Sequence, residues 1–413
     1  PTSGGSFAAT ATADPGTGEY DLWQQCQQLI AASGTDPQGV LDALNELYAN
    51  IALVQSEAGL IAARAQFDNI KVRIAALRSG TQRTSFGGLA FTNSSGNLPI
   101  GSLLQGLAEG DNPDSASAAG FSRWGFFAAG SIGRVDTKPG DVTPGYDSDI
   151  TGLTVGFDYR KSDSIIFGGT VGYTKQTDDL VGREGALDTQ GWSVSLFGTW
   201  YKADSWYTDA VLSWGRNTYE AERWINYTIT GPGGSVTTID QHARTESDGD
   251  SLTFAATVGR DFNKNGWGFG PYLRLLYTRL EFDEMVEETD AGPGSGLALV
   301  VDAREITSFS GVLGGKLTYA HSTDWGVLIP HVQLEWQHEF KDDTSAVTAH
   351  FLFDPSETPF TVTGDRLDTD YLRLGFGMSF VLTKGRSGFF MFERSFQDRI
   401  TQNRLALGLR LEF

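Results

Sequence analysis

Apolar and polar side chains alternate along the stretch 405–413 of the chain. The odd positions carry Leu405, Leu407, Leu409, Leu411 and Phe413, and small or charged residues stand between them. Because successive side chains of a β-strand point to opposite faces, the pattern predicts a strand with one face suited to hydrocarbon and the other to a polar lumen. The pattern recurs about eleven more times upstream, in strands centred near residues 128, 154, 169, 196, 210, 256, 274, 314, 333, 376 and 391.

The alternation also predicts which side chains face inward. Near residue 196, Trp192, Val194 and Leu196 share one face, whereas Ser193 and Ser195 share the other. The same rule, applied to all the strands, turns a set of charged side chains toward the lumen: Asp158, Asp209, Glu335, Glu339, Arg373 and Glu393.

The connections between the predicted strands alternate in length. Short ones cover 161–163, 202–204, 263–266, 321–324 and 383–387, and long ones cover 136–147, 178–187, 221–246, 284–304 and 342–364. Aromatic residues such as Trp200, Trp206 and Trp267 stand beside the short ones, as in the girdle at a membrane interface. The predicted strands, roughly 12–20 residues long, also exceed the usual ~5–6 residues. These features favour an all-β fold, a twelve-stranded antiparallel transmembrane β-barrel; a soluble barrel or sandwich is the alternative that the alternation alone leaves open.

Residues 19–79 carry a helical pattern instead. Asp36 and Pro37 form a start signal, a capping side chain followed by a proline in the first turn. From about 47 to 78, apolar residues recur at seven-residue spacing: Leu53, Leu60, Phe67 and Ile74. A helix of ~28 residues spans ~42 Å, longer than a ~30 Å hydrocarbon core, but its charged residues exclude contact with lipid. We therefore expect an amino-terminal helical segment in the barrel lumen.

Four basic side chains of this helix are the expected contacts with the pore wall: Arg64, Lys71, Arg73 and Arg78. In a narrow lumen, opposite charges on the inward faces of the strands would hold such a helix in place. The alternative is that each charge is hydrated or paired with a neighbouring strand.

The chain divides into four predicted segments. Residues 1–18 lack periodicity and are predicted to be a linker to an upstream domain, and 19–79 form the helical segment. Residues 80–121 are a Gly- and Ser-rich connection without an assignment, and 122–413 form the barrel. No signal peptide is present at the start, so we expect a larger precursor.

Composition and charge limit which kinds of protein this chain can be. Mean hydropathy is only -0.22, which suits a barrel because only its outer face must be apolar. No run of ~18 apolar residues predicts a membrane-spanning helix. The net charge of -20 argues against nucleic acid, and Cys26 is the sole cysteine, so neither a disulfide framework nor a cysteine metal site is expected.

Signals of catalysis or ligand binding are weak. None of the five histidines has zinc-ligand spacing, and no hydrolase elbow, phosphate loop or dinucleotide fingerprint is present. His331 on an inward face could serve a barrel hydrolase, but a hydrogen-bonded lumenal histidine is the simpler interpretation. The carboxylates of 281–290 suit Ca²⁺ but lack EF-hand spacing, so a solvated loop is expected. We expect no cofactor, no metal and no catalytic residue.

Three stretches carry a resemblance to a known family. Residues 67–78 resemble the lumenal helix of type Va autotransporters, with Arg73, Leu77 and Arg78 at the family's basic and Leu-Arg positions. The terminal stretch 409–413 resembles the signal that the barrel assembly machinery reads, and 336–340 matches a sequence common near the late strands. Asp68-Asn69 stands where self-cleaving members carry Asn-Asn, which puts cleavage in doubt.

The resemblance implies an autotransporter translocator domain in the bacterial outer membrane, with long loops at the cell surface. It would support export and display of an amino-terminal passenger by type V secretion and would not be an enzyme. Implied partners are outer-membrane lipid, the barrel assembly machinery, periplasmic chaperones and its own passenger, on a monomeric barrel. The alternatives are an outer-membrane channel for a small solute and a barrel hydrolase.

Overall fold

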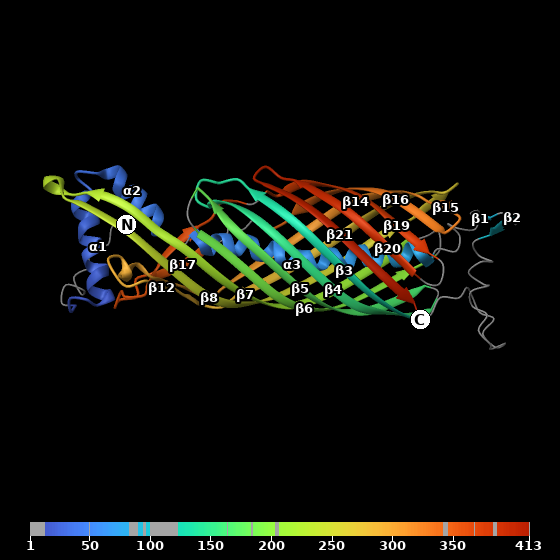
Figure 1. Ribbon diagram of the computed structural model, residues 1–413, viewed down its shortest axis with the longest axis horizontal. Coiled ribbons are helices and arrows are strands. Elements are labelled where there is room, and N and C mark those ends of the chain that lie inside the picture. Colours follow the sequence, from blue (N-terminus) through green and yellow to red (C-terminus); the bar gives the residue numbers. More distant parts are fainter. Residues whose placement is uncertain are drawn as a thin grey trace.

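Twelve antiparallel strands form a closed barrel with a helix inside it (Figure 1). The computed structural model describes residues 13–48, 50–81, 90–93, 96–99, 123–162, 164–182, 185–202, 206–341, 346–366, 368–382 and 386–412. The barrel strands, each paired with its neighbour, are β3 (Trp124–Thr137), β4 (Gly145–Ser162), β5 (Ile165–Val181), β6 (Gly185–Tyr201), β7 (Trp206–Thr230), β8 (Val236–Arg260), β10 (Trp267–Phe282), β14 (Arg304–Tyr319), β16 (Gly326–Glu339), β19 (Asp370–Leu382), β20 (Arg386–Phe396) and β21 (Ile400–Glu412). The last strand, β21, pairs with the first, β3, so that Leu405 lies opposite Ile132. The predicted fold class is therefore confirmed.

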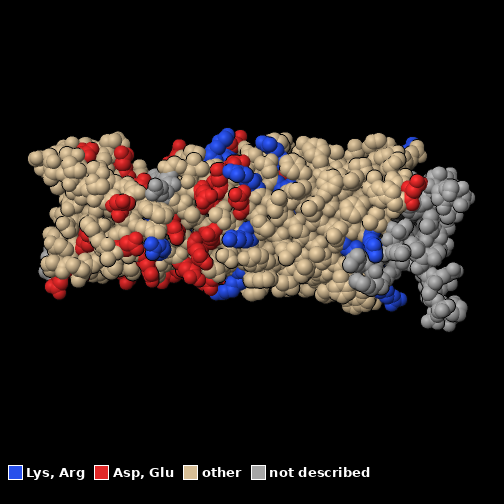
Figure 2. Space-filling view, viewed as in Figure 1, with Lys and Arg blue, Asp and Glu red and all other residues tan. Residues whose placement is uncertain are grey.

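Inward and outward side chains alternate along the barrel strands as the sequence predicts. On β6, Trp192 and Leu196 are each 63% exposed, whereas Ser195 between them is 1% exposed. Figure 2 shows the consequence on one face of the molecule: a broad band without charged side chains, bordered by a row of Lys and Arg, and beyond the row a region rich in Asp and Glu. The uncharged band, which we call the belt, is the surface suited to lipid.

Two predicted long connections are wrong. The region 221–246 is mostly strand, because β7 and β8 run for 25 residues each and pair from Trp206 with Arg260 to Thr230 with Val236. The region 178–187 is also mostly strand, since β5 ends at Val181 and β6 begins at Gly185. The outward residues of both hairpins change from apolar to charged or polar beyond the belt, but backbone pairing does not depend on that change.

Two of the other long connections, 284–304 and 342–364, contain short strands that fold over the mouth of the barrel. β11 (Met285–Val286), β13 (Leu299–Val301), β17 (Ala346–Phe351) and β18 (Phe360–Thr363) form a four-stranded sheet. β12 (Glu288–Thr289) pairs with β8, and the 3-10 turns η2 (Pro232–Gly234) and η3 (Ser295–Leu297) complete this end. At the opposite end, β9 (Phe262–Lys264) and β15 (His321–Thr323) extend the short connections.

Two amino-terminal helices pack on the projecting β7–β8 hairpin. α1 (Gly18–Ala32) is capped by the Thr17 hydroxyl, and α2 (Pro37–Glu46) is capped by Asp36, whose carboxylate accepts from Gly39 N. The predicted start signal of α2 is thus confirmed. We call α1, α2, the four-stranded sheet and the β7–β8 hairpin from 222 to 245 the cap.

The long helix α3 (Asn50–Thr81) runs through the barrel from the cap end to the end that carries the short connections (Figure 1). Its 32 residues continue to Thr81, two residues past the end of the predicted helical segment at 79. Within the part of the chain that the structure describes, no helix has both the length and the apolar character needed to cross a bilayer. Of the unassigned segment 80–121, the structure describes the end of α3 and the hairpin of β1 (Ala90–Asn93) and β2 (Gly96–Pro99).

Candidate functional site: the helix inside the barrel

At the level of the belt, α3 has an apolar face and an ionic face. Phe67, Ile70, Ile74 and Leu77 are all buried in one apolar cluster with wall residues of β3, β5, β6, β7, β10 and β14. The ionic face carries Asp68 and Lys71 and points to β16, β19, β20 and β21. A helix with two such faces fits this lumen in one rotational setting, because any other would bury charge against apolar wall.

Lys71 is the centre of the ionic face. Its Nζ lies 2.9 Å from Glu393 Oε1 on β20, 2.9 Å from Asp68 Oδ1 one turn earlier, and 4.0 Å from Glu335 Oε2 on β16. The side chains of Lys71, Asp68, Glu393 and Glu335 are all less than 10% exposed. An ammonium removed from water to this extent needs such partners.

Three barrel arginines surround the same carboxylates. Arg274 Nη1 lies 3.0 Å from Glu335 Oε1, and Arg404 Nη1 lies 2.8 Å from Glu393 Oε2. Arg373 Nη1 lies 3.5 Å from Asp68 Oδ1 and 3.7 Å from Glu335 Oε2. We call the seven side chains the central network: Asp68, Lys71, Arg274, Glu335, Arg373, Glu393 and Arg404. Because each charge has opposite charges beside it, the network ties α3 to five barrel strands at one level.

Two further ion pairs hold the helix above and below the central network. Arg73 pairs with Asp158 of β4, and Arg410 of β21 approaches the other oxygen of that carboxylate at 3.0 Å. Nearer the cap, Arg64 Nη2 lies 3.4 Å from Glu339 Oε2 and donates to Ser308 Oγ at 2.8 Å. The three basic residues of α3 whose side chains the structure describes therefore each contact a wall carboxylate.

Sequence reasoning missed the amides of α3. Gln66 donates from Nε2 to Thr174 Oγ1 at 2.8 Å and accepts from Thr154 Oγ1 at 2.8 Å. Asn69 donates to Thr154 Oγ1 at 3.0 Å and accepts from Arg404. The inward threonines of β4 and β5 were visible in the alternation, but their pairing with the helix depends on how α3 is rotated.

The remaining predicted site residues divide into three groups. Asp209 is buried and accepts from Thr199 Oγ1 at 2.7 Å on the neighbouring strand. Leu407 and Leu409 face outward, 55% and 65% exposed, and Leu405 is half-buried. The side chains of Arg78 and Leu411, and Phe413 as a whole, lie outside the described residues.

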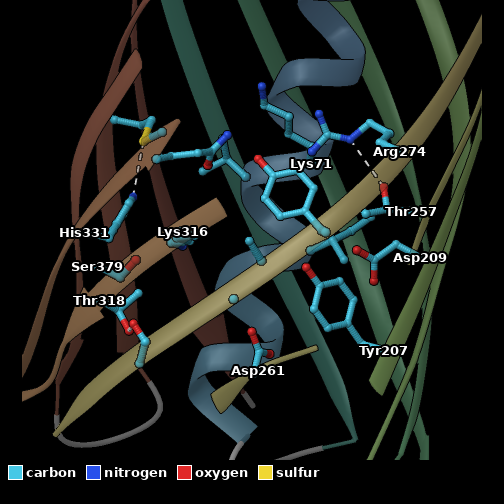
Figure 3. A pocket seen from close by; sticks show the side chains of 18 of the residues that line it. Lys71, Tyr207, Asp209, Thr257, Asp261, Arg274, Lys316, Thr318, His331 and Ser379 are labelled. Carbon is cyan, nitrogen blue, oxygen red and sulfur yellow. Dashed lines mark hydrogen bonds between the residues drawn. The ribbon is translucent and has the colours of Figure 1, made fainter. Parts of the chain in front are cut away.

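A cavity of about 120 Å³ lies beside the helix between the central network and the short connections (Figure 3). Polar and charged side chains from the helix and from several strands line it, among them Lys71, Asp209, Arg274 and Lys316. His331 also lines it, with Nε2 3.2 Å from Met391 Sδ and Nδ1 3.4 Å from the carbonyl oxygen of Ile329. Both partners are acceptors, so a neutral ring, which carries one N–H, donates to one of them. Among the described residues, no group of three or more His, Cys, Asp or Glu side chains is arranged to hold a metal ion.

At the cap end, α3 passes through an apolar ring that we call the collar. The helix contributes Ile51, Ala52, Leu53, Val54, Ala58 and Leu60. The barrel and the sheet of the cap contribute Tyr146, Leu187, Tyr219, Ala221, Leu280, Phe282, Met285, Leu299, Val301, Val347, Ala349 and Val362. All eighteen side chains are at most 7% exposed, so the collar surrounds the helix with little room for water.

A closed barrel with an apolar outer belt, a polar lumen and a helix through that lumen defines a class of protein: a transmembrane β-barrel plugged by its own amino-terminal segment. A family model described as the autotransporter beta-domain matches residues 126–393, more than half of the chain. The chain belongs to this family. It is a translocator domain of the bacterial outer membrane.

Individual relatives agree with this assignment. The chain is 24% identical over 237 residues to Outer membrane protein A of Rickettsia conorii, covering 55% of this chain and 11% of that protein. Outer membrane protein A of Rickettsia rickettsii is also 24% identical over 237 residues, and the match covers 10% of that protein. This chain thus spans about a tenth of the curated relatives it matches. The translocator domain of the autotransporter NalP from Neisseria meningitidis shares the fold, with a TM-score of 0.53 and 15% identity, over 70% of this chain and 88% of that one.

Proposed function

We propose that this chain carries a passenger joined upstream of α1, and that α3 is the tether which connects the displayed passenger to the membrane anchor. The observation that carries the proposal is the course of α3. The helix enters the barrel at the cap end, is held by Lys71, Arg73 and Arg64 against wall carboxylates, and reaches the end with the short connections. A chain that crosses the pore in this direction leaves its amino-terminal part on the cap side.

The proposed orientation has the cap at the cell surface and the short connections in the periplasm. Trp200, Trp206, Trp267 and Trp325 are each 50–53% exposed near the short connections, which suits the inner interfacial girdle. The acidic region of Figure 2 then lies outside the cell, beyond the row of Lys and Arg. The much greater length of the rickettsial relatives agrees with an upstream passenger.

Further partners follow from the same proposal. The barrel assembly machinery would recognise the carboxy-terminal strand through Leu405, Leu407, Leu409, Leu411 and Phe413, and periplasmic chaperones would hold the unfolded chain before insertion. An open strand edge has no place in lipid, so β21 must be recognised and closed on β3 during assembly. The closed barrel functions as a monomer, with transport and anchoring as its role.

Antibody access to epitopes on intact cells tests the proposed direction of α3 through the pore. A reporter peptide joined to Pro1, and an epitope inserted at the exposed β7–β8 tip between Gly233 and Gly234, should both bind antibody on intact cells. The same epitope between Thr323 and Asp324, in a short connection, should bind only after permeabilisation. An amino-terminal reporter that stays hidden in cells whose β7–β8 tip is accessible would overturn the proposal.

A further inference from the structure

The collar lies at and beyond the outer edge of the belt. On three strands, the outward side chain at this edge is a half-exposed arginine: Arg134, Arg216 and Arg279. Leu280 of the collar follows Arg279 directly, and Tyr219 lies three residues beyond Arg216 toward the cap. The helix therefore meets the collar where the barrel leaves the lipid, whereas the central network lies within the belt.

The lumen within the belt can hold water. Its walls present Lys, Arg, Asp, Glu and Thr side chains, and the 120 Å³ cavity between α3 and β7–β16 has room for several molecules, given a volume share of about 30 Å³ each in the liquid. Polar walls of this kind stabilise both water and ions. This part of the lumen therefore positions the helix without forming a dry barrier.

The collar is mainly apolar, and two buried polar side chains of α3 within it are hydrogen-bonded, Gln55 to Ser247 and Arg304 and Glu57 to Tyr146. All ten consecutive residues of α3 from 51 to 60 are buried, so the wall meets every side of the helix there. Gly59 lies directly against the wall: a Cβ atom at this position would lie 3.0 Å from Phe282 Cζ and 3.2 Å from Leu280 Cδ1. The Arg304 guanidinium stacks over the Phe282 ring at 4.6 Å and donates to the carbonyl oxygen of Ala52, which ties the wall to the helix backbone.

We propose that the collar is the permeability seal of the translocator: an apolar ring, closed around α3 by the sheet of the cap, that excludes water and ions at the surface mouth of the pore. Narrow apolar constrictions block conduction by dewetting, whereas polar constrictions conduct. The inference gives the two halves of the pore separate tasks. The central network fixes the position of the helix, and the collar closes the pore around it.

Single-channel recording of the full chain in planar bilayers tests the seal. The collar variant combines Val54→Thr on the helix with Val301→Thr on the wall, both fully buried. The matched control combines Val72→Thr on the helix with Val312→Thr on the wall, which make the same chemical change at the level of the belt. Threonine nearly preserves the volume of valine and adds a hydroxyl that can bind water.

We expect the collar variant to raise ion flux about tenfold over the unmodified chain, because hydroxyls that hydrogen-bond water lower the cost of wetting an apolar ring. The control variant should conduct like the unmodified chain. Equal flux in the two variants, or a rise in the control alone, would overturn the inference. Heat-modifiable migration on gels checks that each barrel is assembled; if the collar pair does not assemble, the single Val54→Thr takes its place with Val72→Thr as its control.

The inference rests on the proposed function in one respect, since it requires α3 to occupy a membrane pore. The two can still fail separately. Antibody access to the amino-terminal reporter measures the direction of the chain whatever the flux, and unchanged flux in a barrel that displays its reporter would reject the seal alone.

Discussion

The same helix meets two different surroundings on its way through the barrel. In the collar every side of α3 is buried, mainly among apolar residues, whereas within the belt one face meets apolar wall and the other meets the central network. Apolar packing has little directional preference, but ion pairs with the barrel wall fix the rotation and height of α3. The comparison teaches that a plugged pore can position its helix at one level, the central network, and close around it at another, the collar.

The largest expected effect concerns the central network. Glu335→Gln would leave Lys71, Arg274 and Arg373 with one carboxylate fewer at a site that is 1% exposed. Breaking a buried ionic cluster in this way costs about 3–5 kcal/mol, so the midpoint of denaturant unfolding in detergent should fall clearly.

The matched control for this change is Glu305→Gln, beside Arg279 at the outer edge of the belt. Glu305 pairs with Arg279 but is half-exposed, so its loss should cost at most about 1 kcal/mol. If the two substitutions lower stability equally, the central network does not hold the helix, and the contrast between the two levels is lost.

A charge on the outer face probes the boundary between the belt and the cap. Leu334 on β16 is 54% exposed within the belt, and Leu334→Arg should cost about 2–4 kcal/mol in a lipid bilayer because the guanidinium faces hydrocarbon. Leu352 directly follows β17 of the cap and is 38% exposed, and Leu352→Arg should change stability by no more than ~0.5 kcal/mol because it faces water. A similar cost at both positions would place the cap within the lipid.

The smallest expected effect concerns the cap helices. Asp36 caps α2 and also accepts from Thr230 N at 3.0 Å on the β7–β8 hairpin, so Asp36→Ala should cost about 1 kcal/mol. Hydrogen exchange should become faster in α2 and at the hairpin tip but not in β16 or β19. Gln38→Ala, which removes only an exposed hydrogen bond to Asp42, should leave exchange unchanged. Faster exchange throughout the barrel would show that cap and barrel unfold together.

Much of the fold was predictable because the signals are local. Period-two alternation predicted the twelve barrel strands, and apolar residues at seven-residue spacing predicted the helix, whose charged residues excluded contact with lipid. The basic side of the ion pairs between helix and wall was also visible, since Arg64, Lys71 and Arg73 stand on a helix that must lie away from lipid.

The cap and the collar were not predictable in the same way. β11, β13 and β18 are two to four residues long, too short to carry a period, and their apolar residues looked like ordinary loop residues. The length of β7 and β8 was missed because polar residues such as Thr228 and Thr238 on the projecting hairpin resemble those of a loop. Residues such as Val301 and Val347 become a ring only when separate connections fold over the same helix, which no local pattern records.

Cross-linking in the assembled barrel tests the central claim, that α3 lies in the lumen, most directly. Val72 on α3 packs against a cluster of wall residues that includes Ala406 on β21, whereas the next residue, Leu407, is 55% exposed on the outer face. Both cysteine pairs, 72 with 406 and 72 with 407, would be made in a Cys26→Ser background. Burial, with the nearby Asp354 carboxylate, raises the pKa of the native Cys26 thiol to about 12, so that thiol reacts slowly in any case.

With a short bis-maleimide in intact outer membranes, we expect mass spectrometry to find linked peptides for Val72→Cys with Ala406→Cys and not for Val72→Cys with Leu407→Cys. Links to position 407 alone, or equal yields from both pairs, would contradict a lumenal helix.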